Sequence, residues 1–361
     1  MADTLKSRFG PAVPREIARN ITSVYRDFPS EDFLRDVLAG YGPLSLTGRG
    51  FHIAAALRKH LPQDYPRAVG LLVKSAREND LPFFLMPHLA FVAKYGLDHF
   101  EESMRAQHAL TQLFTAEFSI RAFLEKHPQK TLARLREWAT DPSPHVRRLV
   151  SEGTRPRLPW AQRLRAFQKD PRPVIELLEL LKDDPEIYVR RSVANNLNDI
   201  GKDHPELVAT LARRWLRDAT PERQWIVRHA LRSAVKRADA GALKALGYGS
   251  KVDVSVGGFS ATPRSPKIGG SVVVRFDVTS KSARRQRVMV DLVVHFVKSR
   301  GTGAKTFKLK AVDLAPRAKM TFSKKIALTQ LTTRKHYAGV HRLEVLLNGE
   351  RRKLGTFLIC R

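Results

Sequence analysis

The sequence predicts a two-part chain, with an α-solenoid over residues 1–247 followed by a β-sandwich over 251–361. Two observations carry this prediction. In the first part, apolar residues recur at three- and four-residue spacing, which is the period of an amphipathic helix. In the second part, short runs of alternating apolar residues are separated by Gly, Pro, Ser and Lys, which is the pattern of strands and turns.

Helices are expected nearly throughout the first part, with breaks at proline and glycine. The expected segments lie near 14–27, 31–40, 51–60, 66–76, 83–95, 98–111, 129–140, 144–152, 160–168, 173–182, 186–200, 204–217 and 221–236. Apolar runs such as 84–93 are far too short to span a bilayer. The first part therefore reads as an all-helical, water-soluble array.

A sequence motif that contains a Val-Arg pair recurs within these helices. It starts at Val146, at Val189 and more weakly at Val227, so the spacings are 43 and 38 residues. A period of roughly 40 residues with two helices per unit is typical of HEAT-like repeats. Polar side chains of adjacent copies should share one concave face. The opposite face of the second copy, which should pack on neighbouring helices, is the apolar stripe of Val189, Val193, Leu197 and Ile200.

The second part contains strand-like runs at 252–256, 271–279, 287–298, 305–314, 320–328, 339–347 and 354–359. The third run shows strict alternation at Val288, Val290, Leu292, Val294 and Phe296. Short strands of this number, separated by turn residues within about 110 residues, indicate an immunoglobulin-like sandwich.

The net charge of +29 is far above that of an ordinary globular protein of 361 residues. Residues 251–361 contain 24 Lys and Arg against 6 Asp and Glu, a net charge of +18. Such an excess favours a polyanionic partner, with nucleic acid ahead of an anionic membrane. The basic loops 280–287 and 297–310 are expected to contact phosphates. A merely solubilising surface is the alternative.

The sequence lacks the motifs of several common catalytic and cofactor-binding sites. It contains no Gly-rich phosphate loop, dinucleotide fingerprint, His-Glu-x-x-His pattern, nucleophile elbow or cysteine cluster. Its twelve histidines are scattered singly, and its one cysteine is Cys360. We therefore expect no metal and no cofactor, so that an enzyme of this sequence would use carboxylates and aromatic side chains. The single cysteine and the polar N-terminal segment predict a cytoplasmic protein without membrane attachment, and we expect a monomer.

Two segments resemble the AlkC branch of the HEAT-like-repeat alkylpurine DNA glycosylases: VRRLVSEGTRPRLPW at 146–160 and VRRSVANNLNDIGKDHPELV at 189–208. GFHIAAALRKHLP at 50–62 and DYPRAV at 64–69 add to a likeness that covers most of 1–245. The resemblance implies base-excision repair of duplex DNA, by hydrolysis of the N-glycosidic bond of small cationic alkylated bases. The implied base is chiefly N3-methyladenine, removed without full base flipping. A basic immunoglobulin-like extension occurs in some members of this family.

Matched by motif position, the active-site residues of this family fall on Glu152, Trp160 and Asp199. Glu117 would complete an acidic cluster, and Arg148 would hold Glu152. The carboxylates would stabilise positive charge on the sugar and position water, while the tryptophan stacks on the cationic base. The basic residues expected to bind flanking phosphates are Arg155, Arg157, Arg163, Arg190, Arg191 and Lys202.

Each of these assignments has a purely structural alternative. Glu152 could pair with Arg148 at the end of a helix, and Glu117 could be a solvated helix residue. Trp160 could anchor the core, and Asp199 could cap a turn. The whole solenoid could likewise be a non-catalytic scaffold that binds nucleic acid or a protein. Converging carboxylates favour the enzyme, because acidic groups weaken the binding of phosphates.

Overall fold

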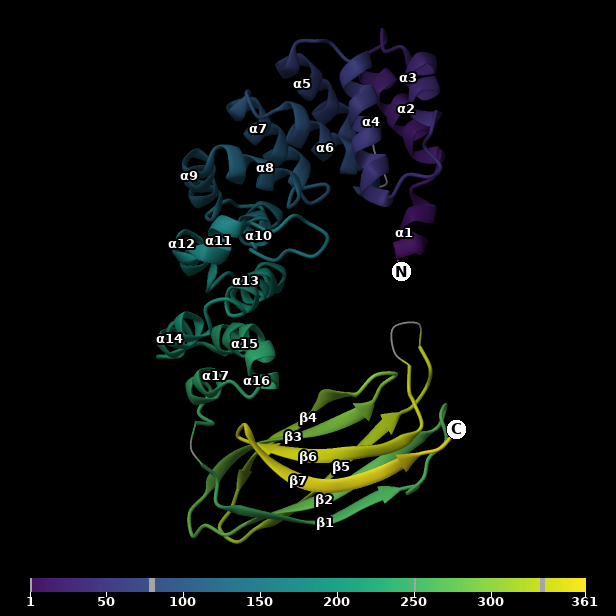
Figure 1. Cartoon of the computed structure of the whole chain (residues 1–361). Helices are drawn as coiled ribbons and strands as arrows, with labels where there is room; N and C mark the ends of the chain where they lie inside the picture. Colours follow the sequence, from purple (N-terminus) through teal and green to yellow (C-terminus); the bar gives the residue numbers. More distant parts are fainter. Residues whose placement is uncertain (1, 78–81, 250, 332–334) are drawn as a thin grey trace. The chain divides into compact units, whose positions relative to one another are not determined.

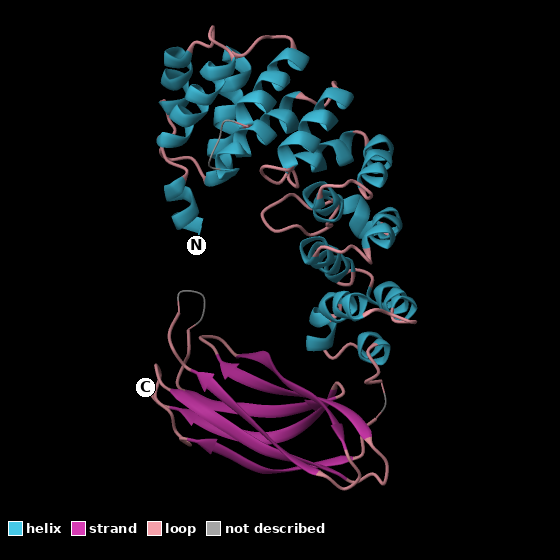
Figure 2. Ribbon diagram, turned by 180° about the vertical axis from the view of Figure 1, so that it is seen from behind, coloured by secondary structure: helices cyan, strands magenta, loops and turns pink. Residues whose placement is uncertain are grey.

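The computed structural model describes residues 2–77, 82–249, 251–331 and 335–361. Helices fill the first part of the chain and strands fill the second, without alternation between the two kinds of element (Figures 1 and 2). The predicted order, a helical array followed by a β domain, is confirmed.

The helices agree with most of the predicted segments. They are α1 Ala2–Arg8, α2 Ala12–Val24, α3 Ser30–Leu38, α4 Leu46–His60, α5 Tyr65–Ala76, the 3-10 helix η1 Pro82–Leu85, α6 Met86–Tyr95, α7 Phe100–Thr111, α8 Ser119–Lys126, α9 Pro128–Trp138, α10 Pro144–Gly153, α11 Arg165–Lys169, α12 Arg172–Leu181, α13 Ile187–Ile200, α14 Pro205–Trp215, α15 Pro221–Ala230, α16 Arg232–Lys236 and α17 Ala240–Ala245. The sequence prediction missed α1, α8 and α17, and the single helix expected over 221–236 is divided into α15 and α16.

The repeat inferred from the Val-Arg motif is visible in the structure as the same hydrogen-bond pattern at the starts of α10 and α13. Asp141 and Asp184 each accept a hydrogen bond at Oδ1 from the backbone N–H two residues later, at 2.8 and 2.9 Å. Arg147 donates through Nη1 to the carbonyls of Asp141 and the following proline, and Arg190 does the same after Asp184. Arg147 also donates through Nε to Asp184 Oδ2 at 2.6 Å, which fastens one repeat to the next.

Helices of the first part stack in two layers. In one of them, here called the α10 layer, α4 packs on α6, α6 packs on α8, and α10 packs on α13. The other layer contains α2, α5 and α7, packed in that order (Figure 1). The predicted apolar stripe on α13 is buried in this packing, with at most 3% exposure for Val189, Val193, Leu197 and Ile200.

The prediction of a helix over 160–168 is wrong in its first half. Helix α11 begins only at Arg165, and the residues between α10 and α11 form a loop, here called the 154–164 loop. Trp160 in this loop has a φ of 65°, in the left-handed region that a bulky residue rarely adopts. A right-handed helix cannot run through that conformation, so the helix starts after it.

The β domain is a sandwich of two antiparallel sheets, and each predicted run overlaps one strand. The strands are β1 Val254–Thr262, β2 Ser271–Ser280, β3 Gln286–Val297, β4 Thr302–Leu314, β5 Lys319–Ala327, β6 Gly339–Leu347 and β7 Glu350–Ile359. One sheet has the order β1-β2-β5, and the other has the order β4-β3-β6-β7. The alternating residues predicted on β3 lie in the shared core, with exposures of 5% or less.

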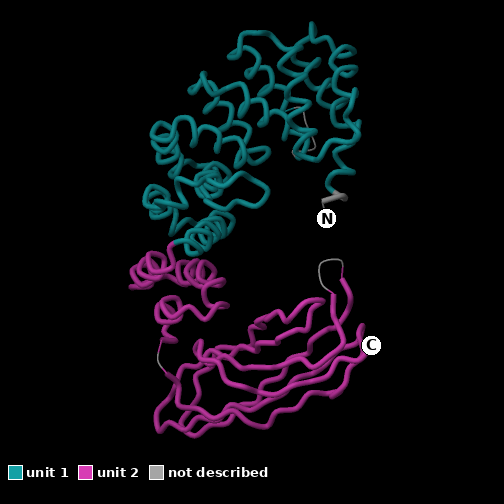
Figure 3. Tube along the Cα trace, viewed as in Figure 1, with its two compact units in different colours: residues 1–203 teal, residues 204–361 magenta. Residues whose placement is uncertain are grey.

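The chain divides into two compact units, residues 1–203 and 204–361, so that α14 to α17 belong with the sandwich (Figure 3). Within the second unit, a Cβ at Gly349 would lie 2.6 Å from Leu243 on α17, and glycine therefore permits this close approach. The Arg287 guanidinium of β3 lies 4.8 Å from the centre of the Tyr248 ring. The division into functional domains at 1–247 and 251–361 stays a prediction.

Candidate active site

Three carboxylates that are distant in the sequence are linked through ion pairs in the α10 layer. Glu117 lies just before α8, Glu152 near the end of α10 and Asp199 near the end of α13. Gly153 allows α10 to approach α8, because a Cβ there would lie 2.5 Å from Ile120 Cγ2. The carboxylates and their cationic partners are here called the acid row, which consists of Glu117, Arg148, Glu152, Arg155, Asp199 and Lys202.

Arg148 organises the first half of the acid row. Its Nη1 lies 2.7 Å from Glu117 Oε2, and its Nη2 lies 3.7 Å from Glu152 Oε1. The expected pairing of Arg148 with Glu152 is therefore present but long, and Glu117 is the closer partner. The side chains of Glu117 and Glu152 are 12% and 8% exposed, so neither is a solvated surface group.

Arg155 organises the second half. Its Nη1 lies 2.6 Å from Glu152 Oε1, and its Nε lies 2.9 Å from Asp199 Oδ2. The Ser192 hydroxyl donates to Glu152 Oε2 at 2.6 Å, and Lys202 Nζ lies 2.8 Å from Asp199 Oδ1. Both oxygens of each of these carboxylates are therefore engaged, and the Asp199 side chain is only 2% exposed.

Trp160 projects from the 154–164 loop into solvent. The residue is 74% exposed, so it is not a core anchor. Its left-handed φ of 65° is strained for a tryptophan. Strained backbone of this kind persists only where the surrounding structure fixes it, and it concentrates at functional sites.

Buried Arg121 of α8 supplies that fixation. Its Nη1 donates to the carbonyls of Gly153 at 3.0 Å and of Arg155 at 2.8 Å, and its Nη2 donates to the carbonyl of Gln162. Burial lowers the pKa of Arg121 to about 10. One side chain therefore fastens both ends of the loop that carries Trp160. The sequence gives no local signal of this role, because the bonded carbonyls lie 32 to 41 residues away.

Tyr188 is a residue at the acid row that the sequence analysis missed. The Arg148 guanidinium lies 5.0 Å from the centre of its ring, and the His145 ring packs edge-on against it at 5.7 Å. Burial raises the pKa of the Tyr188 phenol, and the charges of Glu117 and Glu152 add to that effect. The tyrosine is still 40% exposed, so one part of its ring remains accessible. Tyr188 directly precedes Val189, just as His145 directly precedes Val146 in the preceding repeat. This equivalent position of two ring side chains was the signal in the sequence that could have identified Tyr188.

The predicted phosphate-binding residues fall into two groups. Arg163 and Arg191 are exposed, and Lys202 keeps 39% exposure of its side chain while it pairs with Asp199. These three cations are accessible to a polyanion.

The other three are engaged within the protein. Arg155 lies in the acid row. Arg157 forms a two-pronged pair with Asp203, with Nε to Oδ2 at 3.0 Å and Nη2 to Oδ1 at 2.5 Å. Arg190 donates to the carbonyls at the start of α13, in the same way that Arg147 does in the preceding repeat. Their guanidinium groups serve to hold loops and helix starts.

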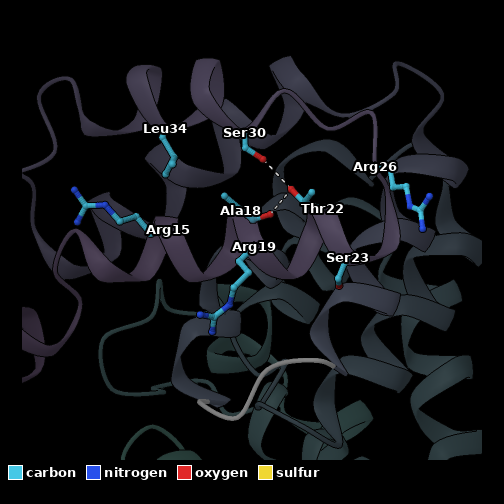
Figure 4. Close-up of a pocket in the computed structure, with 8 residues that line it drawn as sticks. All are labelled: Arg15, Ala18, Arg19, Thr22, Ser23, Arg26, Ser30 and Leu34. Atoms are coloured by element: carbon cyan, nitrogen blue, oxygen red, sulfur yellow. Dashed lines mark hydrogen bonds between the residues drawn. The ribbon is translucent and has the colours of Figure 1, made fainter.

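A hollow of about 620 Å³ lies between α2 and α3, away from the acid row. Figure 4 shows that the side chains of Arg15, Arg19 and Arg26 on its rim point apart. Thr22 and Ser30 are joined across it by a hydrogen bond of 2.8 Å between their hydroxyl groups. The polar groups do not converge on one point, so the acid row is the stronger candidate site.

Membrane-spanning and metal-binding features were also considered for residues 2–77, 82–249, 251–331 and 335–361, the part of the chain that the structure describes. No helix there has the length and apolar character that crossing a membrane requires. No group of three or more His, Cys, Asp and Glu side chains in the same ranges is arranged to hold a metal ion.

Comparisons with known proteins match both parts of the chain. Residues 108–238, which include the acid row, match the family model of DNA alkylation repair enzymes. Residues 255–360 match the model of the C-terminal immunoglobulin-like domain of the uncharacterised protein YhaZ. YhaZ of Bacillus subtilis strain 168 is 36% identical to this chain, over the full length of both. The solved structure of the alkylpurine DNA glycosylase AlkC of Pseudomonas fluorescens, bound to DNA that contains an abasic site analog, is 40% identical. It covers 99% of both chains, with a TM-score of 0.92.

The match of the helical array to DNA alkylation repair enzymes, together with the match of the whole chain to a solved alkylpurine DNA glycosylase, places the chain among the DNA repair glycosylases. The chain belongs to the AlkC family of alkylpurine DNA glycosylases. The fold that its sequence predicts is the fold of that family.

Proposed function

We propose that this chain hydrolyses the N-glycosidic bond of small cationic alkylated bases in duplex DNA, chiefly N3-methyladenine. The observation that carries the proposal is the acid row, in which ion pairs link three carboxylates and one cation, Arg155, shares a loop with the exposed, strained Trp160. A surface that only bound DNA would not gather carboxylates, because they repel phosphates. The AlkC relative, solved on DNA with an abasic site analog, supports the same reaction class.

The chemistry requires little acid catalysis. A base alkylated at N3 is already cationic, so it leaves C1′ with the bonding electron pair as a neutral molecule. Positive charge then develops on the sugar ring, and nearby carboxylates stabilise it. Water adds to C1′ through its oxygen and gives a proton to a carboxylate, which leaves an abasic sugar. A neutral base lacks this leaving ability, so the site would select cations.

The three carboxylates are proposed to have different roles. Glu117 is best suited to orient water, because its contacts with Arg148 and a neighbouring threonine both use Oε2. Its side chain is also more exposed than those of Glu152 and Asp199. The latter two, engaged at both oxygens, would supply fixed negative charge. Trp160 would stack on the cationic base.

We propose that the base is removed without full extrusion from the duplex. A loop tryptophan that is 74% exposed offers an open stacking surface. Enzymes that flip bases enclose them in a pocket instead. Arg163, Arg191 and Lys202 are proposed to hold the flanking phosphates.

Residues 1–247 are proposed to form the catalytic domain and 251–361 a basic domain that binds the DNA backbone, in a monomer that acts in the cytoplasm. The double substitution Arg284→Ser and Arg285→Ser, at two exposed residues of the basic loop before β3, tests whether residues 251–361 bind the DNA backbone. Each lost phosphate contact should reduce the slope of log affinity against log salt concentration by about 0.9. Unchanged affinity and slope would contradict it.

The reaction itself is tested by incubating the purified full chain with methylated duplex DNA and measuring free bases. We expect release of N3-methyladenine and no comparable release of the neutral base hypoxanthine from a matched duplex. A chain that binds the DNA but releases neither base would instead be a non-catalytic DNA-binding scaffold. Comparable release of both bases would contradict the proposed selection for positive charge.

A further inference from the structure

Arg155 lies in the basic turn TRPRLP, where sequence reasoning expects a phosphate contact, but its side chain turns inward. The side chain is only 10% exposed. Its Nη1 and Nε reach two different carboxylates, Glu152 at 2.6 Å and Asp199 at 2.9 Å. These carboxylates belong to α10 and α13, so one guanidinium bridges two neighbouring helices of the α10 layer.

The surroundings of Arg155 explain this orientation. Arg121 donates through Nη1 to the backbone carbonyl of Arg155 at 2.8 Å, which fixes the start of the 154–164 loop. Burial disfavours the Arg155 cation, yet the charges of Glu152 and Asp199 outweigh burial, and the pKa of Arg155 is raised. The charged groups that act on this guanidinium directly are Glu152, Asp199 and Arg121. Arg148 shares Glu152 with it and in turn pairs with Glu117, and Lys202 shares Asp199 with it.

We propose that Arg155 is a positioning residue of the active site, which holds the carboxylates of Glu152 and Asp199 in place and compensates their charge without contacting DNA. Two carboxylates that are 8% and 2% exposed would repel each other if no cation lay between them. The planar guanidinium suits this role, because its donors can serve two acceptors at once. Its catalytic consequence rests on the proposed function of the acid row.

The two roles that Arg155 could have make opposite predictions for Arg155→Met. A phosphate contact would reduce the salt slope of DNA binding by about 0.9 and leave the pH profile of base release in place. A positioning residue would leave the salt slope unchanged. Without the cation between them the two carboxylates repel each other, so the acidic limb of the profile should move to higher pH.

Arg163→Met is the matched control, because Arg163 is an exposed arginine of the same loop. We expect its salt slope to fall by about 0.9 while its acidic limb stays in place. The proposal is overturned if Arg155→Met behaves like Arg163→Met, with a reduced slope and an unshifted acidic limb.

Arg155→Lys covers the case in which Arg155→Met fails to fold. Lysine keeps a charge for phosphate binding, but a single ammonium cannot reproduce the two-armed bridge. We expect this variant to keep the wild-type salt slope of DNA binding but to lose kcat several-fold. A wild-type kcat would overturn the proposal. If the wild type releases no base, the proposed function fails. The salt slopes of the wild type, Arg155→Met and Arg163→Met for binding to abasic-site DNA still decide whether Arg155 contacts phosphate.

Discussion

Arg121→Met removes the guanidinium that fastens the 154–164 loop and should loosen it. Three backbone carbonyls lose a charged donor: those of Gly153, Arg155 and Gln162. At about 1.5 to 3 kcal/mol for each such bond, the three together contribute about 4.5 to 9 kcal/mol. Burying the cation destabilises the folded state and offsets part of this contribution. The lowering of the Arg121 pKa from 12.5 to about 10 corresponds to a cost of about 3 kcal/mol. The net loss of stability is then about 1.5 to 6 kcal/mol.

For a unit of this size, a change of 1 kcal/mol moves Tm by about 2 to 4 °C, so Arg121→Met should lower the Tm of the first unit by about 10 °C. Trypsin reports on the loop itself, because it cleaves after arginine unless proline follows. Arg157 and Arg163 are therefore cleavable sites in the loop, whereas Arg155 is protected by Pro156. We expect cleavage after Arg157 and Arg163 to accelerate in the variant at temperatures where the fold persists.

Arg105→Met is the control for this experiment. Its guanidinium is 69% exposed and pairs with Glu102 at 2.9 Å, and such a surface pair contributes less than about 1 kcal/mol. The control should therefore keep both its Tm and its resistance to trypsin. An Arg121→Met protein with wild-type Tm and wild-type cleavage at the loop would refute the reasoning.

Two further predictions concern Tyr188 and His88. Tyr188→Ala removes the ring beneath Arg148 and should reduce kcat/KM for base release about fivefold, since a cation–π contact contributes about 1 kcal/mol, while Tyr188→Phe should retain most activity. Equal losses in both variants would show that the hydroxyl group matters and not the ring. Burial lowers the pKa of His88 to about 4, so the unfolded chain binds a proton below pH 6.5 that the folded chain cannot accept until about pH 4. Stability should therefore fall by about 3 kcal/mol as pH decreases across this window, and His88→Gln should flatten that dependence in urea unfolding; an unchanged dependence would show that other groups cause it.

Periodicity predicted those parts of the fold in which one face is buried. The stripe from Val189 to Ile200 and the alternation from Val288 to Phe296 both lie in cores, because burial on one side imposes the period on the sequence. Helix α8, with only eight residues, offers too few turns for its period to stand out. The false helix over 160–168 arose because the positive φ of Trp160 is imposed by distant contacts and not by its neighbours.

The candidate site was predictable to the extent that it follows motifs. The resemblance identified the three carboxylates, and the structure links them through a row of ion pairs. The direction of each basic side chain was not predictable, because a loop arginine has the same local sequence whether it turns inward or outward. Arg155 and Arg163 share one loop, yet the first is buried between carboxylates and the second is exposed. Only tertiary packing distinguishes them.

Release of N3-methyladenine from methylated duplex DNA by the wild type and by Glu152→Gln tests the central claim most directly. Glutamine keeps the size of the side chain and its place beside Arg155 and Ser192, but it removes the negative charge. We predict that the variant binds DNA as the wild type does and loses base release by a factor of at least about 100, since charge stabilisation at a reacting centre contributes about 3 kcal/mol. Undiminished release by a folded Glu152→Gln protein would contradict the claim that this carboxylate stabilises the reacting sugar.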